Sequence, residues 1–344
     1  MESERTLRSP GAARRAGYTA RALTETESSA PLVPLLAIVG ATATGKSAVA
    51  LELAEELGLE IVSMDSMQVY RGMDIGTAKP TPEERARVPH SCLDIVEPSE
   101  RYDVSRYLVD AEAACAGARA AGRRALLVGG TGLYLKALVQ GLFAGPRTDP
   151  ELRAELEQRL RLEGSARMHA ELSRVDPPSA ARIHPNDEKR IVRALEVVSQ
   201  TGRTLSDWQR EWGWHGPAGA PRPRRIVGLA IAGDLHAERI HERVEGMLAR
   251  GWVDEARRIR DTTGFGPSAI QALGYREVLE LADGRIDRAA CGARIEQLTR
   301  RFARRQGTWF RSFPEIRWID PETKTARAEA RAVLEGSASG PSGS

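Results

Sequence analysis

The sequence predicts an α/β protein in which a parallel sheet flanked by helices is interrupted by a small all-helical insertion domain. The main observation is that short apolar runs alternate with segments of helical period, which is typical of a parallel sheet with crossover helices. A second observation is that this alternation stops over residues 148–215, where only helical periods occur. The expected strands are residues 35–39, 60–64, 93–96, 125–128, 226–231 and 316–319.

The boundaries of the insertion are marked by residues that begin and end elements. Asp149 followed by Pro150 predicts a helix start, with Asp as the N-cap and Pro at the first helical position. Residues 215–225 are rich in Pro and Gly and return the chain to a strand. The expected organisation is a disordered N-terminal extension (1–33), the first part of the core (34–147), the helical insertion (148–215), the second part of the core (216–323) and a C-terminal tail (324–344).

Composition excludes several classes of protein. The chain has 344 residues, of which 41% are hydrophobic and 28% charged, and it has no run of the roughly 20 apolar residues that a membrane helix needs. Its three cysteines are far apart, which argues against a disulfide framework or a zinc module and favours a cytoplasmic location. A net charge of +3 is too small to indicate nucleic acid, so only local clusters of arginine count as a signal.

One loop carries a specific signal for phosphate binding. Residues 40–47 read G-x-x-x-x-G-K-S, placed between a predicted strand and a predicted helix. The backbone of this loop is expected to surround a di- or triphosphate, Lys46 to add a positive charge, and the Ser47 hydroxyl to ligate Mg²⁺. The core is therefore expected to be P-loop NTPase-like. The expected phosphate-binding residues are Gly40, Ala41, Thr42, Ala43, Thr44, Gly45, Lys46 and Ser47.

Three classes of P-loop protein compete at this point: a nucleotide switch, an ATP-dependent kinase, and an enzyme that uses a diphosphate as leaving group. A GTPase would need N-K-x-D, but the only asparagine, Asn186, is followed by Asp187. An ATPase would place an acidic residue after the strand at 125–128, where this chain has Gly129-Gly-Thr-Gly. The switch is disfavoured, and the other two classes stay open.

Two polar residues follow predicted strands and are expected to face the same crevice as the P-loop. Asp65 ends the strand at 60–64, and Thr131 lies in the glycine-rich turn after 125–128. Ligands bind beyond the carboxyl ends of the strands in an open parallel sheet. Asp65 is interpreted as a general base, with an Mg²⁺ ligand or a turn residue as alternatives. Thr131 could donate to the bridging oxygen of a leaving diphosphate, orient Asp65, or serve only the turn.

Eight segments together closely resemble the tRNA dimethylallyltransferases, the isopentenyl-transferring enzymes of tRNA modification. The resemblance extends over roughly residues 34–320. The segments are residues 40–47, 65–80 (DSMQVYRGMDIGTAKP), 93–96 (LDIV), 129–134 (GGTGLY), 182–187 (RIHPND), 190–196 (RIVRALE), 272–276 (ALGYR) and 304–311 (RRQGTWFR).

The resemblance implies transfer of the dimethylallyl group of dimethylallyl diphosphate to N6 of adenosine 37, in tRNAs reading codons that begin with U. It implies that the P-loop, with Mg²⁺, holds the leaving diphosphate, that Asp65 is the base and that Thr131 neighbours the bridging oxygen. It further implies that adenosine 37 flips out of the anticodon loop, where Gln68 could read its edge. Arg239 and Arg243 are candidates for the diphosphate.

The resemblance also implies contacts with the tRNA anticodon stem-loop. Across residues 300–311, Leu298, Phe302, Trp309 and Phe310 are expected near one helical face, with Arg301, Arg304 and Arg305 as a basic stripe on another. The expected tRNA-binding residues are Asp65, Ser66, Met67, Gln68, Thr131, Arg153, Lys189, Arg190, Ile191, Val192, Arg193, Gln271, Ala272, Leu273, Gly274, Tyr275, Arg276, Arg304, Arg305, Gln306, Gly307, Thr308, Trp309, Phe310 and Arg311.

Nothing after Asp320 has the Cys/His spacing of the zinc finger found in eukaryotic members, so the resemblance is to the bacterial type. A monomer is the expected oligomeric state. The six histidines are not grouped as ligands, and His236 and His241 are interpreted as ordinary helix residues. A small-molecule P-loop kinase using ATP is the alternative function.

Overall fold

The computed structural model describes residues 33–141, 146, 148–212 and 223–337. The expected N-terminal extension, apart from Val33, lies outside the described residues, as does most of the Pro/Gly-rich segment after the insertion. No helix in the described part of the chain is long and apolar enough to cross a membrane.

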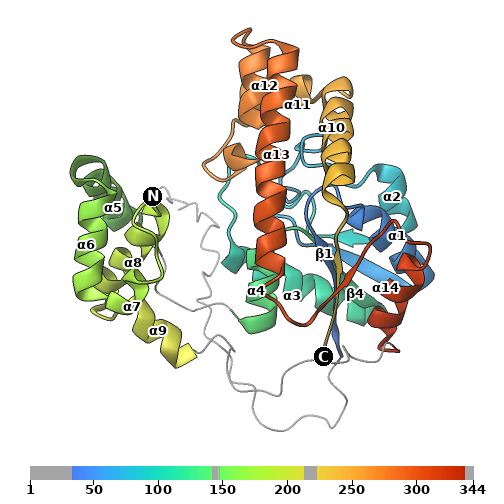
Figure 1. The fold of residues 1–344 in the computed structure, drawn as a ribbon, viewed down its shortest axis with the longest axis horizontal. Helices are drawn as coiled ribbons and strands as arrows, with labels where there is room; N and C mark the ends of the chain where they lie inside the picture. The colour runs from blue at the N-terminus through green and yellow to red at the C-terminus, as the bar shows by residue number, and fades with distance from the viewer. Residues whose placement is uncertain (1–32, 142–145, 147, 213–222, 338–344) are drawn as a thin grey trace, which may run out of the picture. The chain divides into compact units, whose positions relative to one another are not determined.

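The core is a parallel sheet of six strands in the order β3-β2-β4-β1-β5-β6 (Figure 1). The strands are β1 (Leu35–Gly40), β2 (Leu59–Ser63), β3 (His90–Ser91), β4 (Arg124–Gly129), β5 (Arg224–Leu229) and β6 (Ile316–Ile319). Val39 of β1 pairs with Gly129 of β4, and Ser63 of β2 pairs with Val128. The segments that follow β1, β2 and β4 therefore leave the sheet at one edge, which confirms the expected parallel α/β core.

The expected strand at 93–96 is wrong. The edge strand is the shorter β3, and Cys92 and Asp94 have φ of 62° and 53°, in the left-handed region that interrupts an extended chain. The Asp94 carboxylate accepts hydrogen bonds from Lys79 at 2.5 Å and Arg85 at 2.7 Å. Among the described residues, the β-pairing of this segment is limited to an isolated bridge between Tyr70 and Val96.

Helices cover both faces of the sheet, because alternate strand residues are buried on opposite sides. Ala37 and Val39 belong to one apolar cluster, whereas Leu36 and Ile38 belong to another. The helices of the core are α1 (Lys46–Glu56), α2 (Pro82–Arg87), α3 (Val104–Ala120), α4 (Gly132–Gln140), α10 (Gly233–Ala249), α11 (Trp252–Asp261), the 3₁₀ turn η1 (Ala269–Gln271), α12 (Tyr275–Ala282), α13 (Arg288–Phe310) and α14 (Ala326–Glu335).

Helix α14 corrects the expected C-terminal tail at 324–344. Ala326, Ala330 and Leu334 recur every fourth residue, and all three are buried in the same apolar cluster as Leu36. Arg225 donates to the Leu334 carbonyl at 2.9 Å. Low-complexity composition begins only at Gly336, and the ten residues before it have the helical spacing that the tail interpretation overlooked.

Five helices lie within the expected insertion: α5 (Pro150–Glu163), α6 (Ser165–Val175), α7 (Pro177–Ala180), α8 (Glu188–Thr201) and α9 (Leu205–Trp212) (Figure 1). The Asp149 carboxylate caps α5, accepting from the backbone N–H groups of Glu151 and Leu152. Leu156, Leu172 and Leu195 pack in a cluster separate from the two of the sheet. The helices thus bury an apolar core of their own.

Candidate functional site

A cavity of about 560 Å³ lies at the carboxyl edge of the sheet. Many of its lining residues were expected site residues: Thr42, Asp65, Ser66, Met67, Thr131, Arg243, Gln271, Ala272, Leu273, Gly274, Arg276, Arg305 and Gln306. Most of the others are apolar: Val244, Met247, Trp252, Ile270, Ile295, Leu298 and Phe302. The fold therefore brings the P-loop, the ends of β2 and β4 and two distant C-terminal segments to one chamber with a largely apolar wall.

The P-loop is held in shape by its own side chains. The Thr44 hydroxyl donates to the Ala41 carbonyl at 2.9 Å, and Lys46 Nζ donates to the same oxygen at 3.2 Å. Gly45 has φ 81°, a left-handed conformation that leads into α1. The first turn of α1 thus presents the Lys46 ammonium and the exposed Ser47 hydroxyl beside free backbone N–H groups, which together favour an anion.

Two half-buried cations lie near this loop. Burial and, to a smaller extent, the neighbouring Arg243 lower the pKa of Lys46 to about 8, and Asp65 opposes the shift. Burial likewise lowers the pKa of Arg243, again opposed by Asp65. Within the described ranges neither cation forms an ion pair. Arg239, the other expected diphosphate ligand, lies beside Gly45 but is ion-paired with Glu322.

Asp65 uses one carboxylate oxygen to hold its own turn. Asp65 Oδ1 accepts from the Met67 N–H at 2.8 Å, and the Ser66 N–H donates to Thr131 Oγ1 at 3.1 Å. The Asp65 Oδ2 atom has no hydrogen-bond partner among the described residues. The turn role considered for Asp65 is therefore present, and it leaves the second oxygen available to a ligand in the cavity.

The glycines after β4 allow backbone and side chains to approach closely. A Cβ at Gly129 would lie 2.1 Å from the Met64 carbonyl oxygen, and one at Gly132 would lie 2.1 Å from Trp309 Cδ1. The Thr131 N–H also donates to the Met64 carbonyl at 3.2 Å. These contacts fix Thr131 beside the turn of Asp65.

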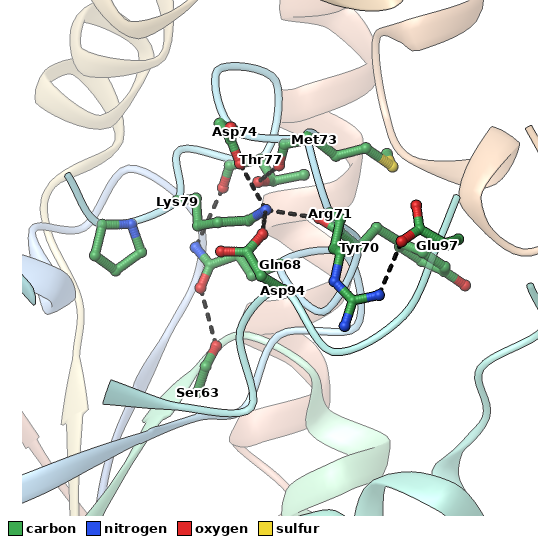
Figure 2. Close-up of polar contacts among 12 residues, drawn as sticks. Ser63, Gln68, Tyr70, Arg71, Met73, Asp74, Thr77, Lys79, Asp94 and Glu97 are labelled. Atoms are coloured by element: carbon green, nitrogen blue, oxygen red, sulfur yellow. Dashed lines mark hydrogen bonds and ion pairs between the residues drawn. The ribbon is translucent and has the colours of Figure 1, made fainter. Parts of the chain in front are cut away.

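The loop that carries Asp65 is anchored by a buried ammonium group (Figure 2). Lys79, whose side chain is 0% exposed, donates to the Tyr70 carbonyl at 2.6 Å, to Asp74 at 2.7 Å and to Asp94 at 2.5 Å. All three donor positions of the ammonium are used, so its charge is both paired and hydrogen-bonded.

A second anchor comes from α11. The buried Glu255 carboxylate accepts from the backbone N–H groups of Asp74, Ile75 and Gly76 and from the Tyr275 hydroxyl at 2.7 Å. It thereby ties the loop to the start of α12. Sequence reasoning missed both Lys79 and Glu255, because each is an internal charge in a segment whose pattern does not reveal burial.

Gln68 is also engaged within this loop (Figure 2). Its Nε2 donates to the carbonyls of Thr77 at 3.3 Å and Ala78 at 3.2 Å, and its Oε1 accepts from the Ser63 hydroxyl at 2.9 Å. The side chain expected to read an adenine edge is thus used to hold the loop together. To contact the base, Gln68 would have to break these hydrogen bonds and form new ones.

The structure divides the expected tRNA-binding residues into exposed and buried groups. Lys189, Arg190, Gln271, Arg276, Arg304, Arg305, Thr308 and Arg311 are exposed. The side chains of Ile191, Val192, Tyr275 and Phe310 are buried and cannot contact RNA from the surface, and the buried Ala272 is reached only from the cavity that it lines. Their apolar character serves the cores, since a contact segment on a helix also contains the face by which that helix packs.

Two expected tRNA ligands in the insertion are bound internally. Arg153 and Arg193 donate to the same oxygen of the buried Glu196, at 2.7 Å and 2.8 Å. Lys189, by contrast, reaches across to Gln271 Oε1 at 3.3 Å. That contact joins two segments that the sequence placed in the same interface.

The buried face of helix α13 consists in part of other residues than expected. The buried face consists of Thr299, Ala303, Gln306 and Phe310, whereas Phe302 is 37% exposed and lies at the cavity with Arg305 over its ring. The expected stripe of Arg301, Arg304 and Arg305 is exposed. Of the residues expected on the apolar face, Phe310 is buried, whereas Phe302 is exposed, and the polar Thr299 and Gln306 complete the buried face.

The chain offers few ligands of its own to a metal ion. The part of the chain that the structure describes contains no group of three or more His, Cys, Asp or Glu side chains able to hold one. The exposed Ser47 hydroxyl next to Lys46 fits a Mg²⁺ ion that takes most of its oxygens from a bound diphosphate.

The chain matches known protein families over most of its length. Residues 68–313 match the family described as IPP transferase, and residues 33–94 match isopentenyl transferase. It is 47% identical over 311 residues to a tRNA dimethylallyltransferase of Methylococcus capsulatus, covering 90% of this chain and 98% of that protein. It is 46% identical over 291 residues to one of Syntrophobacter fumaroxidans, covering 84% of each.

Solved structures are similar as well. The full-length tRNA isopentenylpyrophosphate transferase of Bacillus halodurans aligns with a TM-score of 0.63 and 37% identity, over 88% of this chain and 96% of that one. A eukaryotic dimethylallyltransferase described as acting on tRNA aligns with a TM-score of 0.71 and 26% identity, over 87% of this chain and 77% of that one.

Proposed function

The chain belongs to the IPP transferase family and is a tRNA-prenylating transferase, and from this premise we propose that it transfers the dimethylallyl group of dimethylallyl diphosphate to N6 of adenosine 37, in tRNAs that read codons beginning with U. The single observation that carries the proposal is the cavity in which Asp65 and Thr131 lie beside P-loop residue Thr42 and Arg243. The apolar wall suits a prenyl group, and the unpaired cations suit its diphosphate.

Asp65 Oδ2 is the proposed base. As the N6 lone pair attacks C1 of the donor, the C1–O bond breaks, and the N6 proton passes to the carboxylate. The adenine amine is a weak nucleophile, so proton removal during attack lowers the barrier. Thr131 is proposed to donate its hydroxyl proton toward the bridging oxygen, next to the turn that it stabilises by accepting from the Ser66 N–H.

The diphosphate is proposed to lie on the P-loop, with Lys46 and Arg243 compensating the charge that develops on the leaving group. Ser47 would hold Mg²⁺ together with diphosphate oxygens, and the ion, when bound, would add positive charge at the same place. A cation that is half-buried without an ion pair gains most from an anion that arrives.

The tRNA is proposed to contact the exposed basic residues Lys189, Arg190, Arg304 and Arg305, with the flipped adenine entering the cavity. The arginines that the structure pairs with Glu196 are not needed for this contact. We further propose that the enzyme acts as a monomer in the cytoplasm.

Transfer of radiolabel from dimethylallyl diphosphate to unmodified tRNA tests the proposal, with Mg²⁺ present and ATP absent. The matched acceptor is the same tRNA with guanosine in place of adenosine 37. We expect label on the first tRNA alone. ATP hydrolysis without labelled tRNA would instead support the kinase alternative.

A further inference from the structure

The carboxamide of Gln306 lies inside the protein, although its helix, α13, carries exposed arginines on the other side. Gln306 is 8% exposed. Its Oε1 accepts from the Thr42 N–H of the P-loop at 2.9 Å, and its Nε2 donates to the Gly130 carbonyl at 2.8 Å. One side chain therefore joins the loop after β1 to the loop after β4.

The same P-loop residue is held from its other side. His236 of α10 forms a hydrogen bond from Nε2 to the Thr42 carbonyl at 2.7 Å. The N–H and C=O of Thr42 are thus bound by side chains 264 and 194 residues away in sequence. We call these two side chains, Gln306 and His236, the Thr42 clamp.

Space around the clamp leaves Gln306 little freedom. A Cβ at Gly130 would lie 2.3 Å from Gln306 Nε2, so a glycine there is what lets the carboxamide reach the backbone. The Thr42 N–H is already bonded and is not available to a phosphate. What the clamp can do is fix the loop so that its later N–H groups point toward the diphosphate.

We propose that Gln306 is a positioning residue, not a tRNA contact, and that through the Thr42 clamp it couples tRNA bound on α13 to the diphosphate site. This rests on the proposed function. The outer face of α13 exposes Arg301, Arg304 and Arg305, while the inner face holds Thr42 and Gly130. A small rotation or shift of α13 on binding RNA would therefore act directly on the P-loop.

The decisive variant is Gln306→Met, which keeps the length of the side chain and removes both hydrogen bonds. We expect the affinity for inorganic diphosphate, measured by calorimetry with Mg²⁺, to fall about 5- to 100-fold, because a buried N–H and a buried C=O lose their partners. The Kd for tRNA without diphosphate should stay within about twofold. In the wild type, tRNA should strengthen diphosphate binding by the same factor as diphosphate strengthens tRNA binding, because coupling between two ligands is reciprocal. The variant should lose this coupling, because its side chain no longer joins α13 to the P-loop.

Cys291→Ala is the matched control, because Cys291 is also buried on α13 but lies near the start of the helix, far along it from Gln306. Its thermal unfolding temperature should fall without a change in diphosphate affinity. A Gln306→Met protein that binds diphosphate as the wild type does, or that loses tRNA affinity while diphosphate affinity is unchanged, would overturn the proposal.

The other half of the clamp gives an independent test should Gln306→Met not fold. His236→Ala should weaken diphosphate binding, and His236→Gln, which can still donate to the Thr42 carbonyl, should restore part of it. The double variant His236→Ala/Gln306→Met should lose less than the product of the two single losses, because both side chains hold the backbone of the same residue, Thr42. Additive losses, or no rescue by glutamine, would contradict a shared role. Diphosphate binding needs no prenyl transfer, so these results stand apart from the fate of the proposed function.

Discussion

Two walls of the cavity treat charge in opposite ways. The loop of residues 65–80 contains a fully buried lysine, Lys79, and is held by a buried carboxylate, Glu255, and each of these charges is satisfied within the protein. The wall formed by the P-loop and α10 presents Lys46 and Arg243 half-buried and without an ion pair in the described residues. The charges of the first wall are compensated within the protein, whereas those of the second wall are compensated when an anion binds.

The difference teaches which charges are structural and which are functional. A buried charge with all its partners gives a loop one conformation, whereas removal of one partner leaves an uncompensated charge. A half-buried charge without an ion pair is held at a cost that an anionic ligand offsets. Perturbed pKa values such as that of Lys46 are therefore expected on the wall that binds and reacts.

The largest effect is expected at Asp65, whose Oδ2 atom is open to a ligand in the cavity. Asp65→Ala should lower single-turnover transfer to tRNA by about 10²- to 10⁴-fold, because the proton of N6 loses its acceptor. The Kd for tRNA, measured by filter binding, should change little. A near-normal rate in this variant would remove Asp65 from the chemistry.

The next largest effect tests whether the paired, buried charge of Lys79 stabilises the first wall. Lys79→Met removes the cation shared by Asp74 and Asp94 and leaves the buried Tyr70 carbonyl without its donor, so it should lower the free energy of unfolding by about 1–3 kcal/mol. Arg71→Met is the control in the same loop, since the Arg71–Glu97 pair is exposed and worth about 0–1 kcal/mol (Figure 2). Equal losses in urea titrations of the two variants would show that burial of Lys79 does not matter.

The sequence was sufficient for the parts of the molecule that follow local rules. The P-loop, five of the six strands and the helical start at Asp149 depend on spacing and on residues that begin elements, and all appear in the structure. Burial of individual side chains depends on partners far away in the chain. The burial of Gln306, Lys79 and Glu255 was not predicted for that reason, and neither was the left-handed backbone at Cys92 and Asp94 that interrupts the strand expected at 93–96.

The second wall should respond to pH through Lys46. Its pKa lies near 8 in the folded protein against an ordinary value of 10.5, so the ammonium is disfavoured by folding. Without ligand, stability should therefore rise as pH increases from about 8 toward 10.5, where the unfolded chain still holds the proton. A bound diphosphate favours the ammonium, so its affinity should fall as pH rises through 8.

Lys46→Arg separates this effect from the titration of the diphosphate itself, because arginine keeps its charge over this range. The ratio of wild-type to variant affinity, measured by calorimetry from pH 7 to 10, should decline above pH 8. A constant ratio would mean that Lys46 does not titrate there.

The smallest effect is expected on the exposed face of α13. Arg304→Ala combined with Arg305→Ala removes two solvent-exposed cations, of which Arg305 also lies at the cavity. If each neutralises one tRNA phosphate, the slope of log Kobs against log salt should decrease in magnitude by about 0.7 to 0.9 per arginine. Arg327→Ala on α14 is the matched control, since it removes an exposed arginine that is paired with Glu56 at the end of α1. The same slope in the double variant and in the control would show that the arginines of α13 are ordinary surface residues, and the tRNA would then have to be held by the insertion, through Lys189 and Arg190.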